Sequence, residues 1–375
     1  GLLVGPSGLG LIDFPIDSPS SSVLIAISLA LMLFIDSASL ARGMARVHGH
    51  LTAVMLGPGT LLAGLLVAAA GRWLLDLSLP LAVMLAAALT ATDPVMLRGL
   101  LRRPRLPATA RVALTLETGL SHLLTVPALL ITTALLGPAG SGAVGRDAVA
   151  IFAIGPVAGL VIGLVGIVIL HWARRWLTVH PDLEPLYAMG LALGAFAAAQ
   201  ALGGNGLMAA LAAGLVIAFR SVELSDDLRE KWNGPASIVI FFAVVALGTM
   251  VVERGLESIS PGAVAVAAIA LLARPAILWL CLRGSAVDDD SRRYIVWFGP
   301  RGIASILLIL VPVAAGLDAA KGLLPVVALT VLLSTVGHGA MAVASSRALG
   351  APDRAGAPEL ITITEYRRLV RNHEP

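Results

Sequence analysis

The chain has few charged and few aromatic residues for its length. Charged residues make up 13% and aromatic residues 5% of its 375 positions, whereas soluble domains carry about 25% charged residues. A single cysteine, Cys281, excludes an internal disulfide bond. The composition therefore excludes an ordinary soluble domain, because the polar residues are too few to cover its surface.

Apolar residues are correspondingly abundant in the sequence. They make up 58% of the chain, and 39 Gly and 22 Pro lie among them. Small residues allow close contacts between transmembrane helices, and Pro is better tolerated in a membrane helix than in a soluble one. We therefore expect an all-α membrane protein.

Apolar stretches near 20 residues in length predict about eleven complete membrane-spanning helices. They are expected near residues 22–41, 51–71, 78–97, 112–136, 147–170, 184–202, 205–219, 236–252, 262–282, 294–314 and 322–345. The opening sequence, GLLVGPSGLGLIDFP, reads as the end of a further apolar helix, so we expect a preceding segment. The transmembrane domain is expected to cover residues 1–345.

The positions of Lys and Arg predict the orientation of these helices. Twenty of the 26 Lys and Arg residues fall in alternate loops and in the C-terminal tail, and four fall in the opposite loops. Cytoplasmic loops carry the excess of positive charge. This places the C-terminus in the cytoplasm, and it attributes the formal charge of +3 to membrane topology rather than to nucleic-acid binding.

Four charged residues are expected at membrane depth: Asp93, Glu117, Arg274 and Arg301. A charge at the centre of a membrane helix costs about 2.5–3.5 kcal/mol, and such residues mark functional sites by default. Two residues of each sign suggest pairing, either in a transport site or in two structural ion pairs. Asp36 lies nearer the end of its span, where we expect it to cap the helix or to reach the interface.

Two of the spans are expected to be broken near their centres. In LAAALTATDPVML, Pro94 removes a backbone donor and disfavours helical geometry at Asp93. In YIVWFGPRGIASIL, the GPRG sequence at 299–302 has the same effect. By the loop assignment these spans run in opposite directions. Two units of opposite direction, each with a broken middle helix, are typical of inverted-repeat transporters; the alternative is two Pro-kinked helices without symmetry.

Five motifs resemble the NhaP-type cation:proton antiporter family in order and spacing. They are ATDPV (91–95), LETGL (116–120), ARP (273–275), WFGPRGIAS (297–305) and VLLSTVGHGA (331–340). The resemblance implies a homodimer in which two crossing broken helices move against a scaffold, exchanging sodium or potassium for protons. It also implies a pair between Glu117 and Arg274, a bound ion beside Thr92 and Asp93, and charge balance by Arg301.

The chain departs from this family at the carrier position. The family reads Glu-Ser-Gly-Leu-Asn-Asp, and its last Asp carries the ion and the proton, whereas residues 117–122 read ETGLSH. Hard cations prefer oxygen ligands, so an imidazole cannot replace a carboxylate directly. The candidate ion-binding residues are Thr92, Asp93, Thr118, Ser121 and His122, and those expected to carry the chemistry are His122, Asp93 and Glu117.

His122 leaves three interpretations open. It carries the proton, since an unperturbed histidine titrates near pH 6.5, and Asp93 or Glu117 ligates the cation. It marks a different substrate ion. Or it marks a degenerate antiporter fold with a regulatory or sensing role. His338 is expected to reflect helix packing through Gly337 and Gly339.

An intramembrane enzyme is the competing class. Ser121 and His122 are adjacent and do not face one another on a helix, and the sequence holds no GxSxG motif. We therefore expect a transporter without a cofactor, in a bacterial inner membrane, with a monovalent cation, protons and the lipid bilayer as partners. Residues 346–358 are expected to be a linker, and residues 359–375 either a basic tail or the start of a rhodanese-like domain.

Overall fold

The computed structural model describes residues 9–10, 18–40, 49–101, 103, 105–138, 144–176, 183–220 and 259–349. The regular secondary structure of these residues is helical, and no strand occurs among them. The expected span at 236–252 and the expected tail at 359–375 lie outside the described residues, as does the expected linker beyond Leu349. The all-α prediction is confirmed for the part of the chain that is described.

The helices follow the order of the apolar stretches. They are α1 (Pro19–Ala38), α3 (Gly49–Val54), η1 (Met55–Leu62), α4 (Ala63–Leu74), α5 (Leu79–Thr90), α6 (Pro94–Leu101), α7 (Ala108–Leu136), α8 (Val144–Val149), η3 (Ala150–Ile154), α9 (Gly155–Trp176), α10 (Glu184–Ala201), α11 (Gly206–Arg220), α14 (Pro261–Cys281), α15 (Asp289–Trp297), α16 (Ile303–Ala314), α17 (Asp318–Lys321) and α18 (Leu324–Leu349).

Several of these helices begin at an N-capping residue followed by Pro or acidic residues. The Ser18 side chain accepts a hydrogen bond from the Ser21 backbone N–H, and Pro19 starts α1. Ser260 and Pro261 begin α14 in the same way. These side chains satisfy backbone donors that have no partner within the helix, so the ends of the spans are set by local sequence.

Helices occupy each expected span that the structure describes. The stretches α3–η1–α4 and α8–η3–α9 are each continuous, and η1 is a π-helical segment that contains Pro58. The expected division before α11 is present, because the Asn205 side chain accepts a hydrogen bond from the Met208 N–H and so caps α11. Among the described helices, six are long and apolar enough to cross a membrane. The number of about eleven spans stays a prediction.

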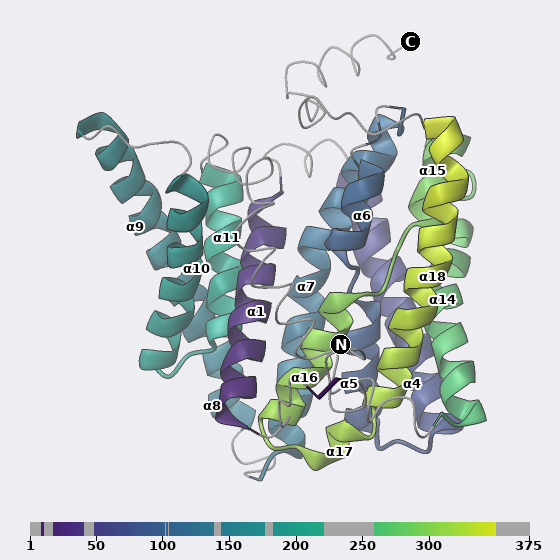
Figure 1. Cartoon of the computed structure of the whole chain (residues 1–375), viewed down its shortest axis with the longest axis horizontal. Coiled ribbons are helices and arrows are strands. Elements are labelled where there is room, and N and C mark those ends of the chain that lie inside the picture. Colours follow the sequence, from purple (N-terminus) through teal and green to yellow (C-terminus); the bar gives the residue numbers. More distant parts are fainter. Residues whose placement is uncertain are drawn as a thin grey trace.

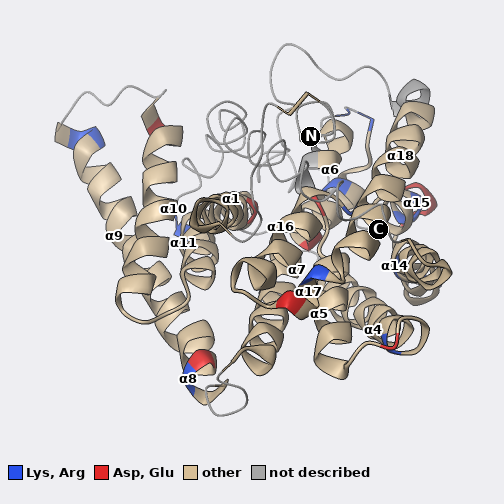
Figure 2. Ribbon diagram, turned by 60° about the horizontal axis from the view of Figure 1, so that its bottom comes forward, with Lys and Arg blue, Asp and Glu red and all other residues tan. Residues whose placement is uncertain are grey.

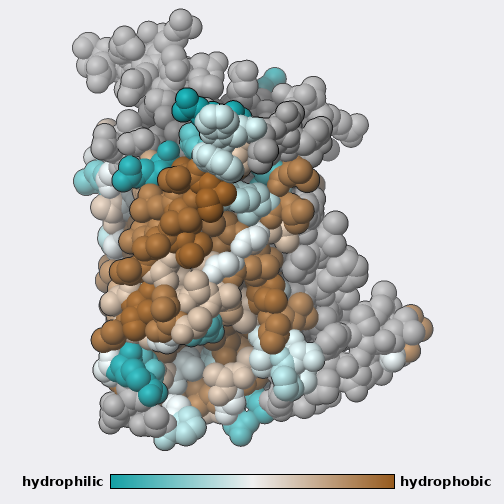
Figure 3. Space-filling model, turned by 90° about the vertical axis from the view of Figure 1, so that its left-hand side faces the viewer, coloured by the Kyte–Doolittle hydropathy of each residue, from teal (hydrophilic) through white to brown (hydrophobic). Residues whose placement is uncertain are grey.

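The outer surface has the pattern of a membrane protein. Figure 3 shows a broad hydrophobic band between more hydrophilic ends, and Figure 2 shows that charged residues are few along the helices and lie mostly near their ends. The exposed apolar side chains of α9 include Val161, Val168 and Ile169, with Trp172 and Trp176 near its end. Apolar residues at the middle and Trp near the ends are what a helix in contact with lipid requires.

The helices form two groups that meet at α1. Helices α9, α10 and α11 lie together on one side, and α4, α5, α14 and α18 lie on the other (Figures 1 and 2). We call these the side group and the central group; the central group also includes α6, α7, α15 and α16. Helix α1 packs against α11 of the side group and against α16 and α7 of the central group. A side chain on α1 can therefore reach residues of either group.

Candidate ion-binding site

The first expected break is present at residues 91–93. Helix α5 ends at Thr90, Ala91 is extended with φ −62° and ψ 127°, and α6 begins at Pro94. Thr92 and Asp93, between the two half-helices, are both fully buried. The break therefore places a hydroxyl and a carboxylate inside the protein, beside backbone groups that have left the helix.

The second expected break separates α15 from α16. Helix α15 ends at Trp297 and α16 begins at Ile303, with the GPRG sequence between them. The two broken helices run in opposite directions: the first goes from α5 at the bottom to α6 at the top of Figure 1, and the second from α15 at the top to α16 at the bottom. The predicted antiparallel pair of broken helices is confirmed.

The two breaks are in direct contact. The Asp93 backbone N–H donates to the Pro300 carbonyl at 2.9 Å. Asp93 Oδ2 accepts from the Ile303 N–H at 2.5 Å, so it caps the start of α16. In return, Arg301 Nη1 donates to the Thr90 carbonyl at 2.7 Å, at the end of α5.

These exchanged contacts match the charge of each helix end. The N-terminus of a helix carries a partial positive charge and the C-terminus a partial negative one. The carboxylate of Asp93 lies at the N-terminus of α16, and the guanidinium of Arg301 lies at the C-terminus of α5. Arg301 is anchored further, since its backbone N–H donates to Ser334 Oγ at 2.7 Å. A residue of each break thus bonds to a free helix end at the other break.

Gly302 makes this approach possible. A Cβ atom at this position would lie 2.0 Å from Asp93 Oδ2 and 2.7 Å from its Cγ. No side chain fits without displacing the carboxylate, so the Gly in FGPRG is explained by the contact between the breaks rather than by helix termination alone.

Glu117 and Arg274 form the expected buried ion pair. Arg274 Nε donates to Glu117 Oε1 at 2.6 Å and Arg274 Nη2 donates to Oε2 at 2.5 Å. Arg274 Nη1 donates to the Val296 carbonyl at 3.0 Å, near the end of α15. Both carboxylate oxygens are engaged in a bidentate pair, and both side chains are buried. This geometry makes Glu117 a structural partner of α14 and leaves it poorly placed to release its ligand.

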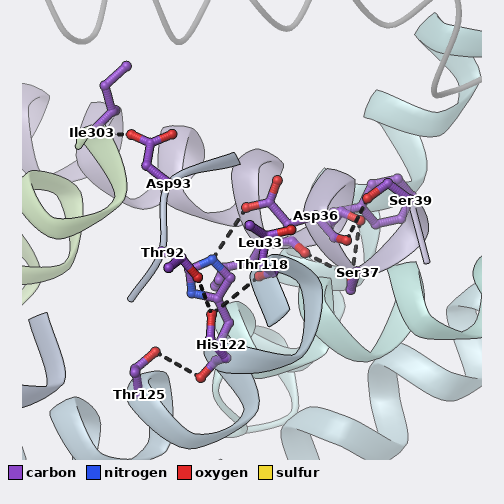
Figure 4. A network of polar contacts seen from close by, with 12 residues as sticks. Leu33, Asp36, Ser37, Ser39, Thr92, Asp93, Thr118, His122, Thr125 and Ile303 are labelled. Carbon is purple, nitrogen blue, oxygen red and sulfur yellow. Dashed lines mark hydrogen bonds and ion pairs between the residues drawn. The ribbon is translucent and has the colours of Figure 1, made fainter. Parts of the chain in front are cut away.

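A row of hydroxyl groups on α7 continues from the first break. Ser121 Oγ lies 3.5 Å from Thr92 Oγ1 and 3.3 Å from the Thr118 carbonyl (Figure 4). The Thr118 hydroxyl donates to the Thr115 carbonyl at 2.9 Å, so its proton does not point toward the first break. The structure therefore brings Thr92 and Ser121 together and places Thr118 one turn away.

His122 lies beside this row and is fully buried. Its Nε2 atom is 3.3 Å from Asp36 Oδ2, across the contact between α7 and α1 (Figure 4). Among the described residues, neither ring nitrogen of His122 makes a hydrogen bond, and Oδ2 of Asp36 makes none either. Because neither ring nitrogen bonds to Ser121, the adjacent Ser and His do not form a nucleophilic dyad.

The expected position of Asp36 is wrong. Its residue exposure is 3%, and it faces His122 rather than capping α1 or reaching the interface. The close approach of α1 and α7 depends on Gly119, where a Cβ would lie 2.8 Å from the Asp36 carbonyl oxygen. The sequence does place Asp36 directly after the apolar run LMLFI, which is compatible with burial. It does not show which helix the Asp36 side chain faces.

His338 belongs to the second break rather than to a helix contact. Its Nδ1 atom is 3.1 Å from Ser334 Oγ, which itself accepts from Arg301. A Cβ on Gly337 or Gly339 would meet no atom within 4 Å, so the expected packing through these glycines is wrong. Within the described residues, no group of three or more His, Cys, Asp or Glu side chains is arranged to hold a resident metal ion.

The geometry of two crossing broken helices agrees with a match to a protein family. The family model described as "Sodium/hydrogen exchanger, transmembrane" matches residues 1–344. The chain belongs to this family. Membership establishes an integral membrane protein of a transporter family, and it explains the paired breaks and the buried charges at their crossing.

Individual members of the sodium/hydrogen exchanger family give the same result. The Na(+)/H(+) antiporter NhaG of Bacillus atrophaeus is 24% identical over 80% of this chain and 61% of its own length. The K(+)/H(+) antiporter NhaP2 of Shewanella sp. (strain MR-4) is 25% identical over 92% of this chain and 61% of its own length. The chain thus spans about three fifths of the length of these curated relatives.

A solved structure of the family shares the fold. The sodium proton antiporter MjNhaP1 from Methanocaldococcus jannaschii superposes with a TM-score of 0.65 at 20% identity, and the match covers 90% of each chain. At this level of identity the likeness establishes the architecture, and the roles of single residues depend on the contacts within this chain.

Proposed function

We propose that this chain is the membrane domain of a secondary transporter that exchanges sodium or potassium for protons by alternating access. The observation that carries the proposal is the pair of contacts that close each break with a residue of the other, through Asp93 and Arg301. Helix ends of both signs meet there inside the protein, beside buried hydroxyl groups, which is how secondary transporters hold small ions.

Roles for the site residues follow from their contacts. Thr92 and Ser121 supply oxygen ligands next to the first break, and Thr118 supports Ser121 from the preceding turn. Asp93 shapes the site by capping α16, and Arg301 balances its charge.

Two further residues complete the proposed site. The Glu117–Arg274 pair fixes α7 against α14. We assign the proton to His122, because its imidazole is buried at the carrier position with Nε2 3.3 Å from Asp36 Oδ2.

The wider context is part of the same proposal. The complete membrane domain has about eleven spans in this chain, with the C-terminus in the cytoplasm of a bacterium and the protein in its inner membrane. The resemblance to NhaP-type antiporters further implies that the protein acts as a homodimer, and we propose that it is a transporter rather than an enzyme. The positive-inside distribution of Arg supports the orientation.

Proton flux in everted membrane vesicles tests the proposal. The full-length protein is compared with its His122→Ala and His122→Asp variants, with sodium, potassium and lithium chloride added in turn. We expect the wild type to exchange at least one of these cations for protons and His122→Ala to abolish the exchange. A silent wild type, with exchange only in His122→Asp, contradicts the proposal and identifies a degenerate antiporter fold.

A further inference from the structure

Asp36 is a buried acid that the proposed roles leave unused. Its Oδ2 atom has no hydrogen bond among the described residues, and the side chain that it faces is His122, whose ring nitrogens have none either. Leaving a buried polar atom without a hydrogen bond costs about 1–3 kcal/mol, and more for a charged group. Buried polar groups are nearly always bonded, so such a cluster requires a functional explanation.

The other two carboxylates near the breaks are already engaged. Glu117 uses both oxygens to hold Arg274, and Asp93 uses Oδ2 to cap α16. Both oxygens of Glu117 and Oδ2 of Asp93 are thus used in contacts that hold helices together. Asp36 contributes to neither contact, so its carboxylate can take a ligand without disturbing the crossing.

The charge of the site also favours a cation once Asp36 is included. Asp36, Asp93 and Glu117 are buried, as are the guanidinium groups of Arg274 and Arg301. Three carboxylates and two guanidinium groups leave one negative charge when His122 is neutral. Without Asp36 the charges cancel, and the site has no electrostatic preference for a cation. Because charges interact strongly away from water, this excess negative charge favours a cation over an anion.

Hydroxyl oxygens lie near the Asp36–His122 pair. His122, which contacts Asp36, follows Ser121 in sequence, and Ser121 Oγ approaches Thr92 Oγ1 at 3.5 Å. Figure 4 shows Thr92 and His122 below the carboxylate of Asp36. Sodium and potassium are hard cations that are bound by carboxylate, hydroxyl and carbonyl oxygens.

We propose that Asp36 on α1 is the carboxylate that binds the transported cation, in place of the acid that position 122 lacks. The inference rests on the proposed function and names the ligand of the same site. The negative charge then lies on α1, across the α1–α7 contact from position 122, and Asp36 Oδ2 is 3.3 Å from His122 Nε2. The cation is then held between α1 and the central group, instead of by the central group alone.

Cation-dependent proton flux by purified full-length protein in liposomes tests this at one fixed pH. Asp36→Asn keeps the shape of the side chain and removes its charge, and we expect it to raise the half-saturating cation concentration about tenfold or more. Asp76→Asn is the matched control, because Asp76 is a surface acid paired with Arg72. We expect the control to behave as wild type. Wild-type flux and cation affinity in Asp36→Asn overturn the inference.

A double variant transfers the carboxylate from position 36 to position 122. Asp36→Asn combined with His122→Asp returns a carboxylate to the same buried space, so we expect it to recover cation-dependent flux that Asp36→Asn alone has lost. If Asp36→Asn does not fold, Asp36→Glu keeps the charge and extends it by one methylene group. We expect Asp36→Glu to change the ratio of sodium to potassium affinity, and an unchanged ratio overturns the inference.

Cation binding without transport separates this inference from the proposed function. A ligand that binds the folded state raises the unfolding temperature, so thermal unfolding is measured in sodium, potassium or lithium chloride and in N-methyl-D-glucamine chloride of equal ionic strength. Stabilisation of the wild type but not of Asp36→Asn supports the inference even if no flux occurs. Equal stabilisation of both proteins overturns it, and wild-type flux then still supports the proposed function.

Discussion

The first helix break supplies a carboxylate and a hydroxyl group, whereas the second supplies a guanidinium group and two glycines. Asp93 and Thr92 come from the first, and Arg301 comes from the second. The first break has Pro94 at the start of its second half-helix, and the second has Gly302 as the residue before α16. Two segments that interrupt a helix at the same depth thus have different chemistry.

The difference shows how each broken helix is held. A half-helix end inside a membrane protein needs a partner for its free backbone groups. Neither Asp93 nor Arg301 serves its own helix in the contacts described above: Asp93 caps α16 and Arg301 bonds to the end of α5. A change in one break should therefore loosen the other helix, and four substitutions test this from the largest effect to the smallest.

Gly302→Ala should have the largest effect, because the new Cβ would lie 2.0 Å from Asp93 Oδ2. It both overpacks the crossing, at about 1–3 kcal/mol, and displaces a charge-assisted hydrogen bond worth about 1.5–3 kcal/mol. We expect a large fall in the thermal unfolding temperature in detergent. Gly190→Ala is the control, since a Cβ there meets nothing within 4 Å; equal effects of the two changes would contradict the crossing geometry.

Arg301→Ala should come second. It removes one of the largest fully buried side chains and leaves the Thr90 carbonyl without its donor, at an expected cost of about 2–5 kcal/mol. Hydrogen exchange measured by mass spectrometry should increase at the end of α5, although the substitution lies before α16. Arg72→Ala removes an exposed arginine and should stay within about 0.5 kcal/mol of wild type. An increase confined to α15 and α16 would refute the exchange of caps.

Asp93→Ala should have a smaller effect, of about 1.5–3 kcal/mol, because it removes one charged cap and a smaller side chain. Increased hydrogen exchange is expected in the first turn of α16, beginning at Ile303. Asp93→Asn keeps an oxygen that can accept from the Ile303 N–H, and Asn and Asp are similar as N-caps, so its cost should be about 1 kcal/mol or less. If Asn is as disruptive as Ala, charge rather than capping is the role of Asp93.

Ser334→Ala should have the smallest effect, about 0.5–1.5 kcal/mol, because it removes one neutral acceptor from the Arg301 backbone N–H. The unfolding temperature should fall slightly, with hydrogen exchange rising near the second break and α5 unchanged. Thr335→Ala is the neighbouring control, since its exposed hydroxyl bonds within α18. A change in α5 as large as that of Arg301→Ala would mean that Ser334 positions the guanidinium.

Sequence patterns predicted the parts of the site that depend on local chemistry. Pro94 removes a backbone donor directly after Asp93, and the GPRG sequence combines Pro with two glycines, so both breaks could be placed before the structure was known. The cost of leaving a charge alone in a membrane predicted pairing in general, and the resemblance to NhaP-type antiporters implied the specific pair of Glu117 and Arg274.

The parts that sequence patterns missed depend on how helices pack. Asp36 was placed near the interface because it lies close to the end of its apolar run, yet the close contact at Gly119 brings that turn of α1 against α7. No periodic pattern in α1 points to the contact, since the helix is apolar on most of its surface. The exchange of caps between Asp93 and Arg301 was missed for the same reason: both residues were counted as charges, and their partners are backbone groups of another helix.

The exchange of caps also has a mechanical consequence. Because Asp93 holds the start of α16 and Arg301 holds the end of α5, neither half-helix can tilt away without releasing a charged group from its partner. The two broken helices are therefore expected to move together as one rigid unit. The contact between α1 and α7 differs from this crossing, because it is a close approach at Gly119 and the Asp36–His122 pair lies across it.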